Sequence, residues 1–395
     1  MSRGLFLILP GHGHVNPTIG LVNELVNKGD KIVYITAEEF RDKLEKVGAK
    51  FLGYELEDGS LKFNPNEINK SMQDLNNSAT LMEKFMETSK KTLELIFTLT
   101  GEFDYLVIDH FLLLDTDLFA SKFNIKKIIS SITTFALNEK LMDDMFNLMM
   151  STLTKSGATI PQDIKENMAG IREAFLNKKC DLKIVFTSKY YQPYGDEFDD
   201  SFKFVGPSIF DRKELVDFKI EKTNNKKLIL ASLGTVANEN QVFYKNCFEA
   251  LGGRNDIDVI MSIGKRININ DLGEIPKNFK VYNYVPQLEV LKHVDLFITH
   301  GGMNSSSEGL YNDVPLIVVP QFGDQPIVAN RVADLKAGLA LIGDENLIPS
   351  AISKAVDKVL SCNLYKENAQ KIGKSLRELN GYKEAANLIK KILLK

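Results

Sequence analysis

Short apolar runs alternate with helical patterns along the whole chain of 395 residues. In the first half, runs that predict buried strands cover residues 5–9, 31–35, 105–108 and 127–130. In the second half, similar runs cover residues 227–232, 258–262, 280–282, 296–299 and 316–319. Strands that alternate with helices in this way form parallel sheets with helices on both faces. The pattern therefore predicts an α/β fold.

The two halves of the chain begin alike. GLFLILPGHGH near the start and KLILASLGT from Lys227 are both apolar runs that end in a glycine turn before a helical segment. This is the pattern of the first strand of a doubly wound domain. Because the chain is longer than the size at which one core usually stops growing, we expect two domains of roughly 200 residues each. We predict two Rossmann-like, doubly wound domains that face each other across a cleft.

Polar stretches suggest where these domains begin and end. The first domain is predicted to cover residues 1–207, because the polar segment 208–226 lacks a sustained core pattern and is typical of a linker. The second domain would then cover residues 227–381. The final segment, 382–395, has the spacing of an amphipathic helix, which we expect to pack back on the first domain.

Composition excludes several classes of partner. A net charge of −3 offers no broad basic surface for nucleic acid, so an anionic ligand must be held by local dipoles. No run approaches the roughly 18 apolar residues that span a membrane, which predicts no integral membrane segment. Cys180, Cys247 and Cys362 lie far apart and form no CxxC pair, which favours reduced thiols. We expect a cytoplasmic protein, and its oligomeric state stays open.

The clearest candidate site lies near residue 300. The apolar run 296–299 ends at His300-Gly301-Gly302, and a helical segment opened by Asn304 and Ser305 follows. Free N–H groups, a helix dipole and an imidazole would then meet at one point. Such a point is suited to a diphosphate.

Three further segments of the second half could complete that site. Ser232-Leu233-Gly234-Thr235 follows a strand and offers hydroxyl and N–H groups to a phosphate. Glu308 lies one helical turn after Asn304 and Ser305, where a carboxylate could accept hydrogen bonds from ribose hydroxyls. Asp324-Gln325 follows another strand and could bind adjacent sugar hydroxyls.

A candidate acid–base pair lies in the first half. His14, in the turn GHGHVNP, is expected at the carboxyl end of the sheet, where a neutral imidazole could take a proton from a hydroxyl. Asp109 ends another buried run and should emerge at the same edge. If the two meet, the carboxylate fixes the imidazole tautomer. The alternatives are a His14 that bonds the turn backbone and an Asp109 that caps a helix.

Two other segments each have a chemical and a structural interpretation. Asp115-Thr116-Asp117 is like a metal-binding DxD, but it opens a helical segment, so capping is favoured. No other group of His, Cys or carboxylate residues has metal-ligand spacing, and no metal is predicted. Segments 60–100 and 136–178 are rich in Met, Phe and Leu, which fits a hydrophobic pocket or the buried stripe of a helix. The candidate residues for that stripe are Met142, Met145, Met149 and Met150.

The segment from Val285 to Asn330, VPQLEVLKHVDLFITHGGMNSSSEGLYNDVPLIVVPQFGDQPIVAN, resembles the donor-binding signature of one enzyme family. GHVNP, from Gly13 to Pro17, is similar to the N-terminal motif of the same family. This is the family of UDP-dependent glycosyltransferases that includes plant secondary-metabolite enzymes and bacterial macrolide glycosyltransferases. The likeness covers nearly the whole chain, and it implies the GT-B architecture.

The resemblance also implies roles for individual residues. His14 would be the general base and Asp109 its orienting partner. The donor would be held by several groups: His300, Asn304, Ser305 and Thr235 at the diphosphate, Glu308 at the ribose, Asp324 and Gln325 at the sugar, and Val285 and Gln287 beside the nucleoside. Gly302, Gly234 and Ser232 belong to the turns that form this site. The donor is a substrate, so no cofactor and no obligatory metal are implied.

We therefore expect an inverting glycosyltransferase that moves a sugar, by resemblance glucose, from a UDP-sugar to a hydroxyl of a small hydrophobic acceptor. A phenol, a flavonoid or a macrolide would fit, and the product would be a β-glycoside. Where the plant signature has tryptophan, this chain has Tyr284 and Met303, which leaves UDP and dTDP open.

Other functions are compatible with the same architecture. They are a sugar-nucleotide epimerase, a glycosyltransferase for a lipid or cell-wall precursor, and a nucleotide-binding protein without catalysis. A nicotinamide dehydrogenase is disfavoured, because the GxGxxG pattern is broken at Asn16.

Overall fold

A computed structural model describes residues 1–56, 76–155, 170, 172–210, 218–220, 223, 225–235, 238–343 and 346–394. Its described residues form two compact units, which divide at Phe210. The C-terminal segment from Leu379 belongs to the first unit, and the second unit ends at Glu378. Much of the expected linker, 208–226, lies outside the described residues.

The first unit is built on a seven-stranded parallel sheet. Its strands are β1 (Arg3–Leu7), β2 (Lys31–Ala37), β3 (Lys50–Tyr54), β4 (Tyr105–Asp109), β5 (Lys127–Ile132), β6 (Leu182–Val185) and β7 (Phe202–Phe204). They lie in the order β3-β2-β1-β4-β5-β6-β7. The chain therefore winds outward in both directions from β1 and β4, as in a Rossmann-like domain.

The second unit repeats this topology with a six-stranded parallel sheet. Its strands are β8 (Lys227–Ser232), β9 (Ile257–Ser262), β10 (Phe279–Tyr282), β11 (Leu296–Thr299), β12 (Leu316–Val318) and β13 (Gly338–Ala340). Their order is β10-β9-β8-β11-β12-β13, so the reversal falls between β8 and β11. The prediction of two doubly wound α/β domains is confirmed.

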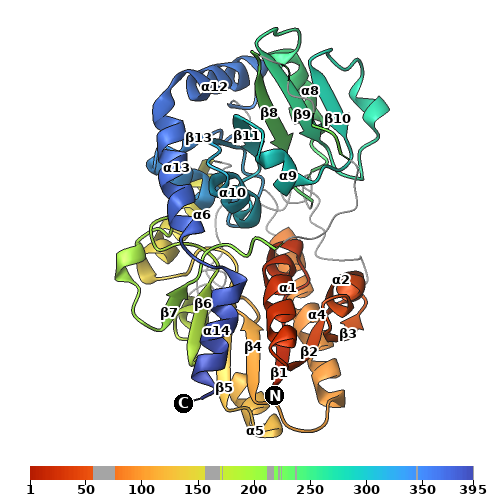
Figure 1. Ribbon diagram of the computed structural model, residues 1–395, viewed down its shortest axis with the longest axis vertical. Helices are drawn as coiled ribbons and strands as arrows, with labels where there is room; N and C mark the ends of the chain where they lie inside the picture. The colour runs from red at the N-terminus through yellow and green to blue at the C-terminus, as the bar shows by residue number, and fades with distance from the viewer. Residues whose placement is uncertain are drawn as a thin grey trace. The chain divides into compact units, whose positions relative to one another are not determined.

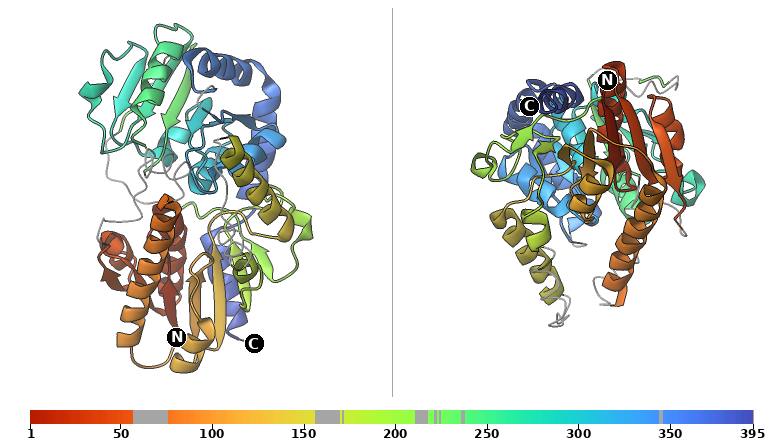
Figure 2. Two further views of the ribbon diagram at one scale, coloured as in Figure 1. Left: turned by 180° about the vertical axis from the view of Figure 1, so that it is seen from behind. Right: turned by 90° about the horizontal axis from the view of Figure 1, so that it is seen from below.

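Helices cover both faces of each sheet. In the first unit, α1 (His12–Asn27) and α14 (Tyr382–Ile392) lie in front of the sheet in Figure 1, and the reverse view in Figure 2 shows α4 (Asn76–Thr98) on the other face. The remaining α-helices of this unit are α2 (Arg41–Glu45), α5 (Thr116–Phe123) and α6 (Glu139–Lys155). Those of the second unit are α8 (Gln241–Leu251), α9 (Gln287–Leu291), α10 (Met303–Tyr311), α11 (Gln325–Asp334), α12 (Pro349–Ser361) and α13 (Asn363–Arg377).

The C-terminal helix α14 completes the core of the first unit. Ala385, Ala386 and Ile389 are fully buried and belong to the same hydrophobic cluster as the strands of the first sheet. Gly20 of α1 allows the close approach, because a Cβ there would lie 2.8 Å from the ring of Tyr382. The amphipathic spacing of the sequence is therefore satisfied by burial against α1 and the sheet.

A buried carboxylate anchors the end of α14. Asp30 is 4% exposed and accepts hydrogen bonds from Ser2 N at 3.2 Å and Tyr105 OH at 3.0 Å. Lys390 Nζ of α14 lies 2.5 Å from Asp30 Oδ1. A buried charge of this kind is costly unless its partners are in place.

Replacing Lys390 by methionine should lower the free energy of unfolding by about 1–3 kcal/mol, because the buried Asp30 loses its cationic partner. Lys391→Met is the matched control, since Lys391 is the exposed neighbour on the same helix. Thermal unfolding followed by circular dichroism compares the two variants with the parent. Equal unfolding temperatures for Lys390→Met and Lys391→Met would show that the ion pair does not stabilise the fold.

No helix in the part of the chain that the structure describes has both the length and the apolar composition needed to cross a bilayer.

Candidate active site

Both predicted clusters lie at the switch point of their own sheet. In the first unit, α1 follows β1 and Asp109 ends β4, and these two strands are neighbours. In the second unit, β8 and β11 are neighbours, with Ser232 paired in register with Thr299. At such a point the connections that leave the two strands turn to opposite sides of the sheet, which opens a crevice for ligands.

His14 and Asp109 form a hydrogen-bonded pair. His14 Nδ1 lies 2.8 Å from Asp109 Oδ2, and Asp109 Oδ1 accepts the Phe111 N–H at 3.0 Å. The Asp109 side chain is 1% exposed, whereas that of His14 is 27% exposed. α1 starts at His12, so His14 lies in the first helical turn rather than in a loop before it. Asp109 caps no helix and serves the imidazole instead.

The environment of Asp109 favours its ionised form. Burial alone would raise the pKa of this carboxyl, but the charge and hydrogen bond of His14, the Phe111 N–H and the charge of Lys178 together lower it. A carboxylate that accepts from Nδ1 fixes the tautomer in which the proton sits on Nδ1. In that tautomer Nε2 accepts protons, so the pair can act as a general base.

Sequence reasoning missed three neighbours of this pair. Thr133 Oγ1 lies 3.3 Å from His14 Nδ1, and the ring of Phe111 meets the imidazole edge to face at a centroid distance of 6.2 Å. Lys178 Nζ donates to the carbonyl oxygen of Asp109 at 2.8 Å. Thr133 directly follows β5. If the sequence had predicted this strand as far as Ile132, Thr133 would have been placed at the carboxyl edge of the sheet. Nothing in the sequence around Lys178 indicates its position.

In the second unit, the turn after β8 lies against the imidazole of His300. Gly234 has a φ of +80°, and a Cβ there would lie 2.5 Å from His300 Cε1. A Cβ on Gly302, the residue before α10, would also meet this ring. Asn238, which sequence reasoning missed, donates to the Gly234 carbonyl at 2.7 Å and so fixes the turn. The two glycines therefore leave the ring just enough room between the turns.

The imidazole of His300 is held in its neutral form. Burial lowers the pKa of its imidazole to about 4, so at neutral pH the ring is uncharged. Attraction for an anion comes from the N-terminus of α10, whose first turn presents N–H groups and the positive end of the helix dipole. Asn304 and Ser305 lie in this first turn. His300 and the N-terminal turn of the following helix thus lie next to each other, as the sequence predicted.

Gln287 links two of the predicted donor residues. Its Nε2 donates to Glu308 Oε2 at 2.7 Å and lies 3.3 Å from Ser305 Oγ. Glu308 is 4% exposed, so this bond orients a carboxylate that is almost enclosed. Val285 is also 4% exposed, so it offers little surface to a nucleoside.

The remaining predicted residues lie at the same edge of the second sheet. Gln325 starts α11, and its backbone oxygen would be 3.3 Å from a Cβ on Gly301. Its Oε1 accepts the N–H groups of Gln321 at 2.7 Å and Phe322 at 3.2 Å, so only its amide nitrogen could donate to a sugar. Asp324 precedes this helix without capping it.

The hydroxyl group of Ser232 forms a hydrogen bond within the turn that follows β8. Ser232 Oγ accepts the Gly234 N–H at 3.2 Å, which helps to hold the turn. Thr235, the next residue after Gly234, is exposed. Of the two hydroxyls predicted here, that of Thr235 is the more accessible to a ligand.

The structure decides between the two interpretations of Asp115-Thr116-Asp117. Asp115 accepts the N–H groups of Asp117 and Leu118 at 3.0 and 3.1 Å at the start of α5, which confirms the capping interpretation. Among the described residues, no group of three or more His, Cys, Asp or Glu side chains is placed to hold a metal.

The described methionine side chains of α6 do not form a buried stripe. Met142, Met145 and Met150 are only partly buried, and the side chain of Met149 lies outside the described part. The core-stripe interpretation is wrong for the three described methionines. Their side chains keep apolar surface in contact with solvent.

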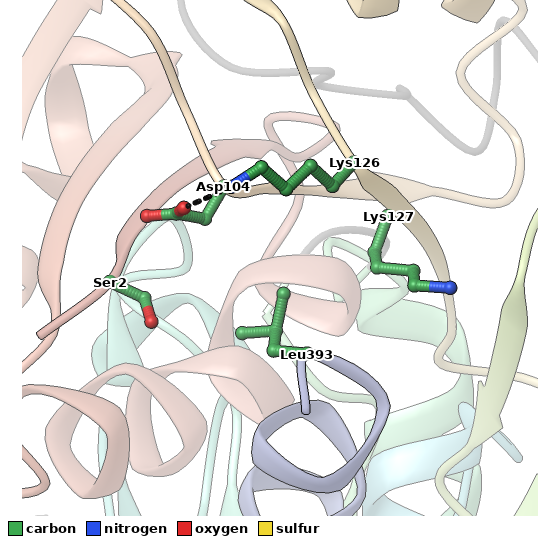
Figure 3. Close-up of a pocket in the computed structure, with 5 residues that line it drawn as sticks. All are labelled: Ser2, Asp104, Lys126, Lys127 and Leu393. Carbon is green, nitrogen blue, oxygen red and sulfur yellow. Dashed lines mark ion pairs between the residues drawn. The ribbon is translucent and has the colours of Figure 1, made fainter. Parts of the chain in front are cut away.

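A small hollow of about 230 Å³ lies elsewhere in the first unit (Figure 3). It is lined by Ser2, Asp104, Lys126, Lys127 and Leu393. The first four residues lie before or at the start of β1, β4 and β5, so the hollow is at the amino edge of the sheet. Lys126 is paired with Asp104 across it, and the hollow takes no part in the candidate site.

Comparisons with known proteins find similarity over the whole chain. Residues 248–380 match the model of the erythromycin biosynthesis protein CIII-like C-terminal domain. A Bacillus subtilis protein called uncharacterized UDP-glucosyltransferase YojK is 34% identical, covering 98% of this chain and 97% of its own. NDP-glycosyltransferase YjiC of the same organism is 35% identical, covering 98% and 96%.

A solved structure shows the same architecture. The calicheamicin glycosyltransferase CalG4 matches with a TM-score of 0.79 and 25% identity, covering 100% of this chain and 99% of its own. The predicted GT-B class, with two Rossmann-like domains, is confirmed by this match and by the two sheet topologies.

Proposed function

Because the chain belongs to the UDP-glycosyltransferase family, and is thus a glycosyltransferase, we propose that it moves a sugar from a UDP-sugar to a hydroxyl of a small hydrophobic acceptor with inversion. The observation that carries this proposal is the 2.8 Å hydrogen bond between His14 and the buried Asp109 at the switch point of the first sheet. A general base of this kind takes the proton of an acceptor hydroxyl while its oxygen attacks the sugar.

In the proposed reaction the acceptor is activated by the first unit. His14 Nε2 takes the hydroxyl proton as the acceptor oxygen forms its bond to the anomeric carbon. The bond between that carbon and the diphosphate oxygen breaks, and UDP leaves with the electron pair. Attack opposite to the leaving group converts an α-linked donor into a β-glycoside. Asp109 stabilises the imidazolium that forms.

The second unit would hold the leaving group. Negative charge grows on the diphosphate as the bond breaks, and the N-terminal turn of α10 offers N–H groups and a positive dipole end. His300 and the hydroxyls of Ser305 and Thr235 would donate hydrogen bonds. We propose that Glu308, oriented by Gln287, binds the ribose, and that Asp324 and the Gln325 amide nitrogen bind the sugar. These groups stabilise the charge without an obligatory metal.

The acceptor is proposed to be apolar or aromatic. Phe111 lies beside His14, and the partly buried methionines of α6 are adaptable apolar groups of the same unit. Erythromycin-type biosynthesis, named by the matching domain model, fits a macrolide-like acceptor, and a phenol or flavonoid fits equally. Glucose is the proposed sugar, since a Bacillus relative is called a UDP-glucosyltransferase. The free cysteines favour a reducing, cytoplasmic setting.

The first experiment is a calorimetric titration with UDP in the presence of EDTA, with NAD as the control ligand. We expect UDP to bind without a metal and NAD to give no heat. Acceptor screening with UDP-glucose then measures transfer. If folded protein bound UDP only after a divalent cation was added, the metal-independent part of the proposal would be wrong. Binding of dTDP in place of UDP would move the donor assignment to deoxythymidine sugars.

A further inference from the structure

Lys178 is tied to the strand end that carries Asp109. Its Nζ lies 2.8 Å from the carbonyl oxygen of Asp109, 3.0 Å from that of His110 and 3.0 Å from that of Leu112. An ammonium group has three N–H donors and no acceptor, so these three carbonyls use all of them. The group closes the carboxyl end of β4, where the Asp109 and Leu112 carbonyls also accept the backbone N–H groups of Leu112 and Leu114.

This arrangement fixes the turn that begins at Asp109. The carboxylate of Asp109 is bonded to His14 and to the Phe111 N–H, while the backbone oxygen of the same residue is bonded to Lys178. Movement of the turn would therefore move the oxygen that orients the imidazole. The charge of Lys178 also favours the ionised form of Asp109.

We propose that Lys178 is a positioning residue for the proposed transfer reaction, which holds Asp109 in place against His14 through the three backbone carbonyls. In this role it contacts neither substrate, and it acts through the turn and through its charge beside Asp109. This inference rests on the proposed function, because it concerns the same acid–base pair.

The pH dependence of transfer should reveal this role. Burial lowers the pKa of Lys178 to about 8, against the opposing influence of Asp109 and Cys180. Above that pH the neutral amine has two N–H donors for three carbonyls, so the turn loses one bond. Besides Asp109 and Cys180, the titratable groups of the described residues that face this region are His110, which follows β4, and Lys183 of β6. Burial lowers the pKa of His110 to about 4, so its ring stays neutral at alkaline pH.

Lys178→Met removes the ammonium and keeps most of the apolar side-chain volume. We expect kcat to fall by about tenfold near pH 7, because a small displacement of a catalytic group is costly, while the affinity for UDP stays within about twofold. The parent should lose activity as the pH rises through about 8. This alkaline decline should be absent from both Lys178→Met and Lys178→Arg, because methionine carries no charge and the arginine cation does not titrate in this pH range. Lys179→Met, at the exposed neighbouring residue, is the matched control.

A proton NMR measurement separates this inference from the function itself. The Nδ1 proton of His14 in its bond to Asp109 should give a low-field signal in the parent, and this signal should shift or broaden in Lys178→Met but not in Lys179→Met. An unchanged signal together with an unchanged kcat and pH profile would overturn the role of Lys178. If the parent transfers no sugar at all, the proposed function fails, while the NMR comparison still tests the positioning. If Lys178→Met does not fold, the pH profile of kcat and the NMR signal are measured on Lys178→Arg instead.

Discussion

Replacing His14 by alanine is expected to lower kcat for sugar transfer by about 100- to 10,000-fold, the usual contribution of general-base catalysis. The reason is that the acceptor hydroxyl would have to lose its proton to water rather than to an imidazole already oriented by Asp109 at 2.8 Å. UDP affinity should stay within about twofold, since the proposed donor site belongs to the other unit. Steady-state rates with UDP-glucose and calorimetry with UDP measure the two quantities.

The same turn supplies a matched control. His12 lies two residues earlier. Its ring packs edge to face on Phe40 at a centroid distance of 5.1 Å, whereas Asp109 is bonded to His14. His12→Ala removes an imidazole from the same end of α1 and should keep kcat close to that of the parent. If His14→Ala retained the parent's kcat, the acid–base role of the pair would be refuted. Equal losses in both variants would point instead to a structural effect on the start of α1.

Replacing Gly234 by alanine is expected to weaken UDP binding by about 10- to 100-fold, a loss of about 1.4–2.8 kcal/mol. Two unfavourable effects of the alanine side chain combine at this position. The φ of +80° is unfavourable for alanine, and the new methyl group would lie 2.5 Å from His300 Cε1 and 2.8 Å from Nε2. Either the turn after β8 or the imidazole must move, and both belong to the proposed diphosphate site. Calorimetric titration with UDP measures the change.

Gly253→Ala separates the two costs. Gly253 has a φ of +73° in the same unit, but a Cβ there would meet no atom within 4 Å. Gly253→Ala therefore introduces the backbone strain of a positive φ but no steric clash. It should lower the unfolding temperature and leave UDP affinity within about twofold of the parent. If Gly234→Ala bound UDP as tightly as Gly253→Ala does, the diphosphate would not lie beside His300.

Sequence patterns predicted the central strands better than the outer ones. β8 and β11 have the predicted bounds, because fully buried central strands are continuous apolar runs. Four strands were missed: β3 (KFLGY), β6 (LKIV), β7 (FKF) and β13 (GLA). Three of them are edge strands and all are short, mixed or glycine-containing, so their apolar signal is weak. Their pairing depends on neighbours that the local sequence does not specify.

The sequence by itself determined the α/β class, the two doubly wound halves and the edge of each sheet at which His14, Asp109 and His300 emerge. This was possible because the carboxyl ends of parallel strands share one edge, so local strand ends fix the side on which a site must lie. Only the tertiary structure decided which groups meet: the bond of His14 to Asp109, and that of Gln287 to Glu308. The same is true of Lys178, which reaches the carbonyls of β4 from a segment 69 residues later than Asp109. Contacts between segments so far apart depend on the geometry of packing, which local hydrophobic patterns do not contain.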